Sequence, residues 1–156
     1  KEVNEEAGKT IYTLDIYGQV DSAQTQWFED LKATFPEYMN YKGVVDYDKS
    51  VDVLKNYFAL LFPTRFYTEG IPGTIIDAYA AGVPVISSKW ESFSDVINEG
   101  ITGFRYEFNN VTDLIKRLGY VANNANCITD LKLNCLEKSR DYLPCSIVKI
   151  LIEKLI

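Results

Sequence analysis

The chain has 156 residues, of which 47% are hydrophobic, so it is long and apolar enough to fold around a core rather than remain disordered. Its formal net charge of −6 argues against a basic surface for nucleic acid or anionic lipid. The sequence contains no histidine, the commonest metal ligand and the usual base at neutral pH, and we predict no bound metal.

The cysteines indicate a reducing compartment. There are three, Cys127, Cys135 and Cys145, and they lack the spacing of a zinc site or of a disulfide framework. We therefore expect buried free thiols. No apolar run approaches the roughly 18 residues of a membrane-spanning helix, and the first residues do not resemble a secretory signal. These features predict a cytoplasmic location.

The first third of the chain alternates predicted strands and helices. Apolar spacing and β-forming residues predict these elements in order: a helix end over residues 1–9, a strand over 10–17, a helix over 24–35, a strand over 39–45, and a helix over 51–57 that Asp48 or Ser50 can cap.

A strand, a loop, a helix and a second strand are predicted between residues 56 and 88. Residues 56–62 form an apolar run of strand length, which Pro63 ends because proline cannot donate to a ladder. Helical spacing begins at Gly73, and Gly82 with Pro84 predicts its end. A second buried strand is expected over residues 83–86. This pattern is typical of a βαβ unit.

The remainder continues the alternation, with a short helix within 89–98, a turn over 99–103 whose two glycines suit positive φ, a strand over 104–108, and helices over 111–124, 128–142 and 145–156. We therefore predict an α/β fold, Rossmann-like and doubly wound, with a mainly parallel sheet flanked by helices. We expect residues 1–156 to form a single domain.

The loop of the βαβ unit is the candidate site, because open α/β sheets bind ligands at the carboxyl ends of their strands. Gly70 and Gly73 flank an Ile-Pro pair and lead to a helix N-terminus, whose amides and dipole favour a phosphate or diphosphate. Glu69 and Asp77 could border the same pocket and would bind hydroxyl groups. In the alternative interpretation, Thr74 and Asp77 form a capping box and Glu69 is an ordinary loop acid.

The segment from Phe62 to Ser88 resembles a known signature, that of the C-terminal, donor-binding domain of retaining glycosyltransferases with two Rossmann-like domains. This is the GT-B fold of family four, or glycosyl transferases group 1. The matching residues are two acids separated by seven residues, Glu69 and Asp77, followed by the segment Ala80-Ala81-Gly82-Val83-Pro84-Val85. Three flanking segments also resemble the family, namely Leu14 to Gly18, Tyr41 to Val45 and Gly100 to Phe104. The Pro-Gly-Thr form of the loop is similar to that of bacterial capsule and exopolysaccharide enzymes.

The resemblance implies a role for each matching residue. Glu69 would be the catalytic residue, beside the donor sugar at the reacting centre, and Asp77, where glutamate is usual, would bind the ribose hydroxyls. The loop and helix start would hold sugar hydroxyls and diphosphate through Gly70, Ile71, Gly73 and Thr74. The backbone of Val44 would meet the base. No metal or other cofactor would be needed.

The resemblance also implies a larger enzyme in bacterial polysaccharide biosynthesis. It would transfer a hexose, with retention, from a UDP- or GDP-linked donor to an acceptor sugar or lipid-linked glycan bound by an N-terminal domain. The chain would then be a fragment that starts after the first strand of its domain and is inactive alone. The full-length enzyme would be cytoplasmic, with peripheral attachment to the inner face of the membrane as an option. The alternative is a non-catalytic Rossmann-like module that binds a nucleotide or a protein partner.

Overall fold

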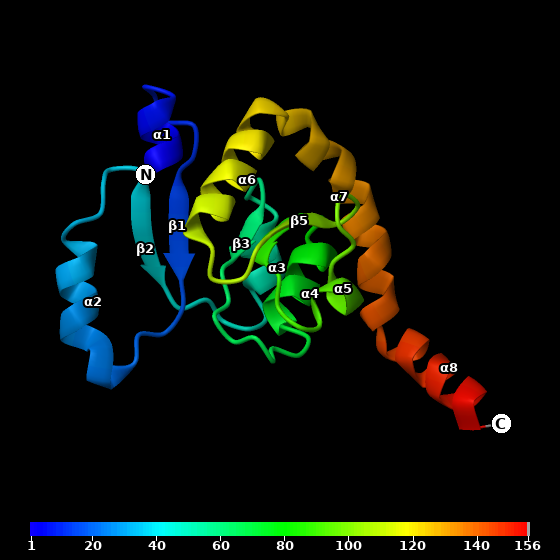
Figure 1. Ribbon diagram of the computed structural model, residues 1–156. Helices are drawn as coiled ribbons and strands as arrows, with labels where there is room; N and C mark the ends of the chain where they lie inside the picture. The colour runs from blue at the N-terminus through cyan, green and yellow to red at the C-terminus, as the bar shows by residue number, and fades with distance from the viewer. Residues whose placement is uncertain (156) are drawn as a thin grey trace. The chain divides into compact units, whose positions relative to one another are not determined.

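The computed structural model describes residues 1–155 and divides into two compact units, one from Lys1 to Lys49 and one from Ser50 onward (Figure 1). Ile156, the expected end of the last predicted helix, lies outside the described residues. All strands pair in parallel within each unit. The predicted α/β class with parallel strands and flanking helices is therefore confirmed.

The first unit pairs two strands. Its elements are α1 (Glu2–Glu6), β1 (Leu14–Tyr17), the 3₁₀ helix η1 (Ser22–Gln24), α2 (Thr25–Lys32) and β2 (Met39–Gly43). The first strand starts later than the predicted residue 10, because the buried Asn4 side chain captures the backbone before it. Asn4 Oδ1 accepts hydrogen bonds from the amides of Ile11 and Tyr12, both at 2.9 Å.

The second unit contains a three-stranded sheet in the order β3-β4-β5. Its elements are α3 (Ser50–Leu54), β3 (Leu60–Phe62), α4 (Gly73–Ala80), β4 (Val85–Ser88), α5 (Phe93–Val96), β5 (Gly103–Tyr106), α6 (Val111–Asn123), α7 (Ala125–Ser139), the 3₁₀ helix η2 (Arg140–Tyr142) and α8 (Pro144–Leu155).

Both faces of this sheet are covered, as the pleat of its central strand shows. Val85 belongs to a buried cluster with residues of α4 and α5, such as Ile75 and Phe93. Its neighbour Ile86 belongs to the opposite cluster, with Val121 of α6 and residues of α7 and β5. Adjacent strand residues point to opposite faces, so β4 is buried on both sides, as the continuous apolar pattern predicted.

All three strands of the second unit have bounds that differ from the predictions. The strand expected from residue 56 begins at Leu60, because the amides of Asn56 and Tyr57 bond back to Val53 and Leu54 and continue the end of α3 as a turn. The following strand covers Val85–Ser88 rather than residues 83–86. The strand predicted over 104–108 starts at Gly103 and ends at Tyr106.

The final helix exposes most of its apolar side chains. None of the described residues of α8 is buried, and its exposed large hydrophobic residues are Ile147, Val148, Ile150, Leu151, Ile152 and Leu155. Within residues 1–155, no helix is long and apolar enough to cross a membrane.

Candidate functional site

The predicted site lies on the segment that joins β3 to α4. Because β3 and β4 are parallel and α4 connects them, residues 63–72 leave the carboxyl end of β3 and lead into the N-terminus of α4. Glu69, Gly70 and Ile71 lie in this loop, and Gly73, Thr74 and Asp77 lie in the first two turns of α4. The structure thus brings six of the seven predicted residues onto one strand-loop-helix connection.

Two buried serines at the end of β4 fix the start of this loop. Ser87 Oγ donates to the Phe62 carbonyl at 2.8 Å, and Ser88 Oγ donates to the Thr64 carbonyl at 2.8 Å. Both serines are almost fully buried in a strand whose first two residues are apolar. Neither serine was among the predicted site residues, although two adjacent hydroxyl residues in a buried strand are a signal for such a role.

Glu69 is half-buried in the loop and contacts Thr64. Thr64 Oγ1 accepts from the amide of Phe66 at 3.1 Å and donates to Glu69 Oε2 across 3.4 Å. A hydroxyl has one proton, so its role as acceptor for Phe66 leaves that proton for the carboxylate. The Thr64 hydroxyl, on a backbone that Ser88 holds in place, therefore orients Glu69, although its bond to the carboxylate is long.

The start of α4 presents uncapped backbone. Pro72 is the N-cap residue, and no side chain caps the helix. The first amides of a helix have no partner within it, so this end can receive an anion. Gly70, Ile71, Gly73 and Thr74 are all exposed, and a Cβ built on either glycine would meet no atom within 4 Å.

The capping-box alternative is wrong. Thr74 is the second residue of α4 and not its N-cap, so Thr74 and Asp77 are not placed to cap the helix. Instead, the half-buried Asp77 accepts a hydrogen bond at Oδ2 from Ser50 Oγ, at 2.6 Å. The sequence predicted for Ser50 only a role as a cap of α3. The carboxylate is therefore turned toward α3 rather than toward its own helix start.

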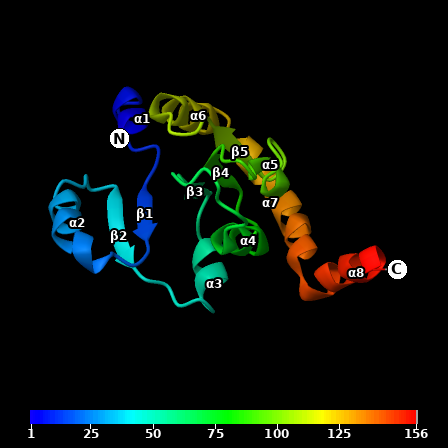
Figure 2. The same ribbon diagram turned by 60° about the horizontal axis from the view of Figure 1, so that its bottom comes forward.

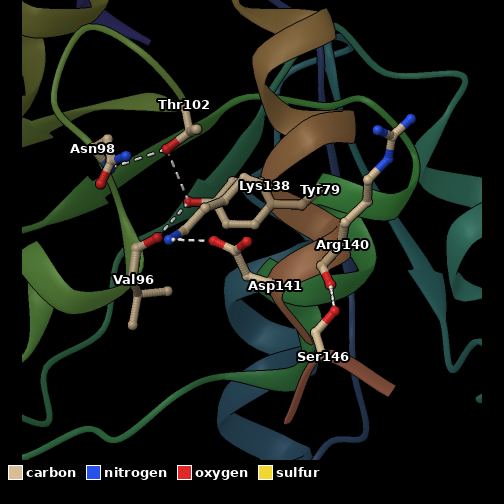
Figure 3. A network of polar contacts seen from close by, with 8 residues as sticks. All are labelled: Tyr79, Val96, Asn98, Thr102, Lys138, Arg140, Asp141 and Ser146. Atoms are coloured by element: carbon tan, nitrogen blue, oxygen red, sulfur yellow. Dashed lines mark hydrogen bonds and ion pairs between the residues drawn. The ribbon is translucent and has the colours of Figure 1, made fainter. Parts of the chain in front are cut away.

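Behind the site, a buried network holds α4 in place (Figure 3). Tyr79 Oη donates to the Val96 carbonyl at 3.0 Å and lies 3.2 Å from Thr102 Oγ1. The amide of Asn98 in turn donates to Thr102 Oγ1. Burial raises the pKa of Tyr79 well above its ordinary value, so it stays protonated and keeps donating. The network links α4 to α5 and to the turn before β5.

At the neighbouring strand end, Tyr106 closes β5 and its carbonyl accepts from the amide of Lys89 at 2.8 Å. Burial raises the pKa of its phenol, and a hydrogen bond with Ser88 offsets part of this rise. The loop after β3 is joined to this edge as well, because Tyr67 contacts the ring of Phe108 edge-on with centroids 5.3 Å apart. The three carboxyl ends of the sheet therefore form one connected edge.

Val44, the remaining predicted residue, lies in the first unit and follows directly after β2, where it is 68% exposed. Among residues 1–155, no group of three or more Cys, Asp or Glu side chains is arranged to hold a metal ion.

The family comparison matches most of the chain. The profile of the family described as glycosyl transferases group 1 covers residues 1–124, which include every predicted site residue. Among curated protein sequences, no match to the chain was found.

Solved structures share the fold at low identity. A GtfA/B complex matches 99% of this chain at 17% identity, with a TM-score of 0.76. Alr3699/HepE from Anabaena, in complex with UDP and glucose, matches 92% at 13% identity, with a TM-score of 0.78. The pneumococcal O-GlcNAc transferase GtfA, in complex with UDP and GlcNAc, matches 98% at 20% identity, with a TM-score of 0.69. The chain spans 31%, 40% and 30% of these structures, respectively.

Proposed function

We propose that this chain, which belongs to the glycosyl transferases group 1 family, is the nucleotide-sugar-binding domain of a retaining glycosyltransferase. The observation that carries the proposal is the connection from β3 to α4, where Glu69 precedes an uncapped helix N-terminus in the chain and Asp77 follows it in the second turn. Two of the matched structures contain UDP together with a sugar.

In this proposal the diphosphate of the donor lies at the start of α4. The exposed amides of the first turn and the helix dipole attract its negative charge. Gly70 and Gly73 carry no side chain, and open space surrounds both, so the ligand can approach the backbone closely. Ile71 and Thr74 line the same approach. No metal is required, because backbone amides rather than a cation meet the phosphate oxygens.

The two carboxylates would bind hydroxyl groups on either side of the diphosphate. Glu69 would lie beside the donor sugar and stabilise positive charge that develops at its anomeric carbon. Asp77 would accept hydrogen bonds from the ribose hydroxyls of the nucleotide. A contact between the Val44 backbone and the base stays a prediction from the family resemblance.

The reaction would transfer a hexose with retention of configuration. The bond between the anomeric carbon and the diphosphate breaks, and an acceptor oxygen bonds to the same face of that carbon. The acceptor proton passes to the leaving phosphate oxygen, so a nucleoside diphosphate and a glycoside are the products. The acceptor would be a sugar or a lipid-linked glycan, bound by another part of a longer enzyme. That enzyme would act in the cytoplasm, in the synthesis of bacterial capsule or exopolysaccharide.

Substitution of the two acids in the full-length protein tests this proposal. Glu69→Ala should lower kcat by about 100-fold or more with the fold retained, because it removes a charge at the reacting centre. Asp77→Asn should raise the donor KM by about tenfold, since it weakens a hydrogen bond to a charged group. Glu137, exposed on α7, supplies the matched control Glu137→Gln, which should leave both constants unchanged.

Near-normal turnover of Glu69→Ala would overturn the catalytic assignment. Calorimetric titration with UDP and GDP helps to distinguish the proposed transferase from the remaining alternative, a non-catalytic module. A protein that binds a nucleotide but shows no transfer from any UDP- or GDP-linked hexose would support that alternative.

A further inference from the structure

The hydrogen bond between Ser50 and Asp77 joins two residues that are 27 positions apart in the chain. Ser50 is the first residue of α3, and Asp77 lies in the second turn of α4. Their oxygens are 2.6 Å apart, within the range of a charge-assisted bond between a hydroxyl and a carboxylate. Such bonds are about twice as strong as neutral ones, so this contact restrains the side chain of Asp77.

Packing fixes the donor side of this bond. Leu54 lies one turn after Ser50, on the same face of α3, and packs against the buried cluster that contains Ile75 and Tyr79 of α4. Figures 1 and 2 both place α3 beside α4. The hydroxyl of Ser50 is thus delivered to Asp77 by a helix that is itself anchored on α4.

The bond leaves most of the carboxylate available. A carboxylate offers about four acceptor positions, and Ser50 occupies one of them at Oδ2. The remaining positions suit a pair of neighbouring hydroxyl groups, which donate two hydrogen bonds at a fixed separation.

We propose that Ser50 is a positioning residue that orients the Asp77 carboxylate toward the vicinal diol of a ribose. The inference rests on the proposed role of Asp77 in donor binding. Ser50 removes rotational freedom from the carboxylate before the ligand arrives, so less entropy is lost when the ribose binds. Its function is therefore discrimination between a ribonucleotide and a deoxyribonucleotide, and not only the stability of α3.

The test measures that discrimination in the full-length protein by calorimetry. The probes are UDP or GDP, whichever the wild type binds more tightly, and the 2′-deoxy form of the same nucleotide. The wild type should prefer the ribonucleotide by about tenfold, as expected for hydrogen bonds to a charged group. Ser50→Ala should reduce this preference to about twofold, and Ser50→Thr, which retains a hydroxyl, should restore it.

A double substitution identifies the path of the effect. If Ser50 acts through Asp77, adding Ser50→Ala to Asp77→Asn should not reduce the preference further. Ser146→Ala is the matched control, because Ser146 is also half-buried near a helix start and donates a bond of 2.7 Å, to the Arg140 carbonyl (Figure 3). It should leave the preference unchanged.

The outcomes distinguish the inference from its premise. If Ser50→Ala weakens both nucleotides equally, or weakens neither, Ser50 has at most a structural role and the inference is wrong. If the wild type binds no nucleotide or shows no ribose preference, the role of Asp77 fails before any substitution at Ser50, and the inference fails with it.

Discussion

The Tyr79 hydroxyl and Thr102 Oγ1 lie 3.2 Å apart at the centre of a one-way chain of buried hydrogen bonds. Tyr79 donates to the Val96 carbonyl, so the Thr102 hydroxyl must donate to Tyr79, while Thr102 Oγ1 accepts from the amide of Asn98. Each hydroxyl thus uses its single proton, and the chain joins α4 to α5 and to the turn before β5.

Removal of the Tyr79 hydroxyl should destabilise the second unit. In Tyr79→Phe, the Val96 carbonyl loses its donor and the Thr102 hydroxyl loses its acceptor, both in the buried interior. We expect a loss of about 1–3 kcal/mol in the free energy of unfolding. Chemical denaturation measures it, with Tyr120→Phe as the control, since Tyr120 is 49% exposed. Equal stability of the two variants would contradict this role.

Gly103 is required for close contact between two strands rather than for a turn. Positive φ was predicted at both glycines of the 99–103 turn, but of the two only Gly100 has it, at 73°. A Cβ on Gly103 would lie 2.1 Å from the Val85 carbonyl oxygen, a backbone atom of the neighbouring strand. This glycine therefore allows β5 to pair with β4.

Gly103→Ala should be among the most damaging single substitutions in the chain. The added methyl group forces the strands apart, which we expect to cost about 3 kcal/mol or more. Gly119→Ala is the matched control, because Gly119 lies within α6 with no atom within 4 Å of a built Cβ. Alanine there should stabilise the protein by about 0.5–1 kcal/mol. Similar denaturation midpoints for both variants would contradict this explanation.

Cys135 should make the folded state sensitive to alkaline pH. Burial raises the pKa of its thiol from 9.0 to about 12. Between these values the unfolded chain has lost the proton and the folded chain retains it, so unfolding releases a proton. The stabilising effect is complete below pH 9 and is lost as the pH rises toward 12. One such group lowers the free energy of unfolding by at most about 1.4 kcal/mol per pH unit.

Denaturation at several pH values between 8 and 11 measures this dependence. Cys135→Ala should show a shallower decline than the wild type, whereas Cys145→Ala, at an exposed residue, should show the wild-type slope. Parallel declines in all three proteins would refute the role of Cys135.

The sequence was a good guide to the local parts of the site. Gly73 begins α4, and Gly82, in the left-handed region at φ 68°, follows its end, as glycine spacing predicted. These features depend on the conformations that single residues allow, so sequence reasoning can reach them. The prediction that a strand begins at residue 56 was wrong, because apolar spacing alone could not reveal the turn that continues α3.

The side-chain partners could not be predicted. Ser50 reaches Asp77 only because α3 packs beside α4, and Ser88 reaches the loop only because β4 pairs with β3. Both contacts depend on tertiary arrangement between residues far apart in the chain. The pattern of Thr74 and Asp77 suggested a local partner. Thr74 cannot cap the helix, because Pro72, two residues earlier, is the N-cap, and Asp77 instead bonds to the distant Ser50.

Thr64 supplies a last prediction about the proposed catalytic acid. Its hydroxyl donates to Glu69 Oε2 across 3.4 Å, and its backbone is tied to β4 by Ser88. Thr64→Val keeps the shape but removes the donor, so Glu69 should lose part of its orientation at the donor sugar. Because the bond is long, we expect only about a threefold fall in kcat, equivalent to less than 1 kcal/mol. Steady-state kinetics of the full-length protein should show an unchanged donor KM, and Thr64→Ser should retain wild-type kcat. A fall in thermal stability with kcat intact would assign Thr64 to loop structure alone.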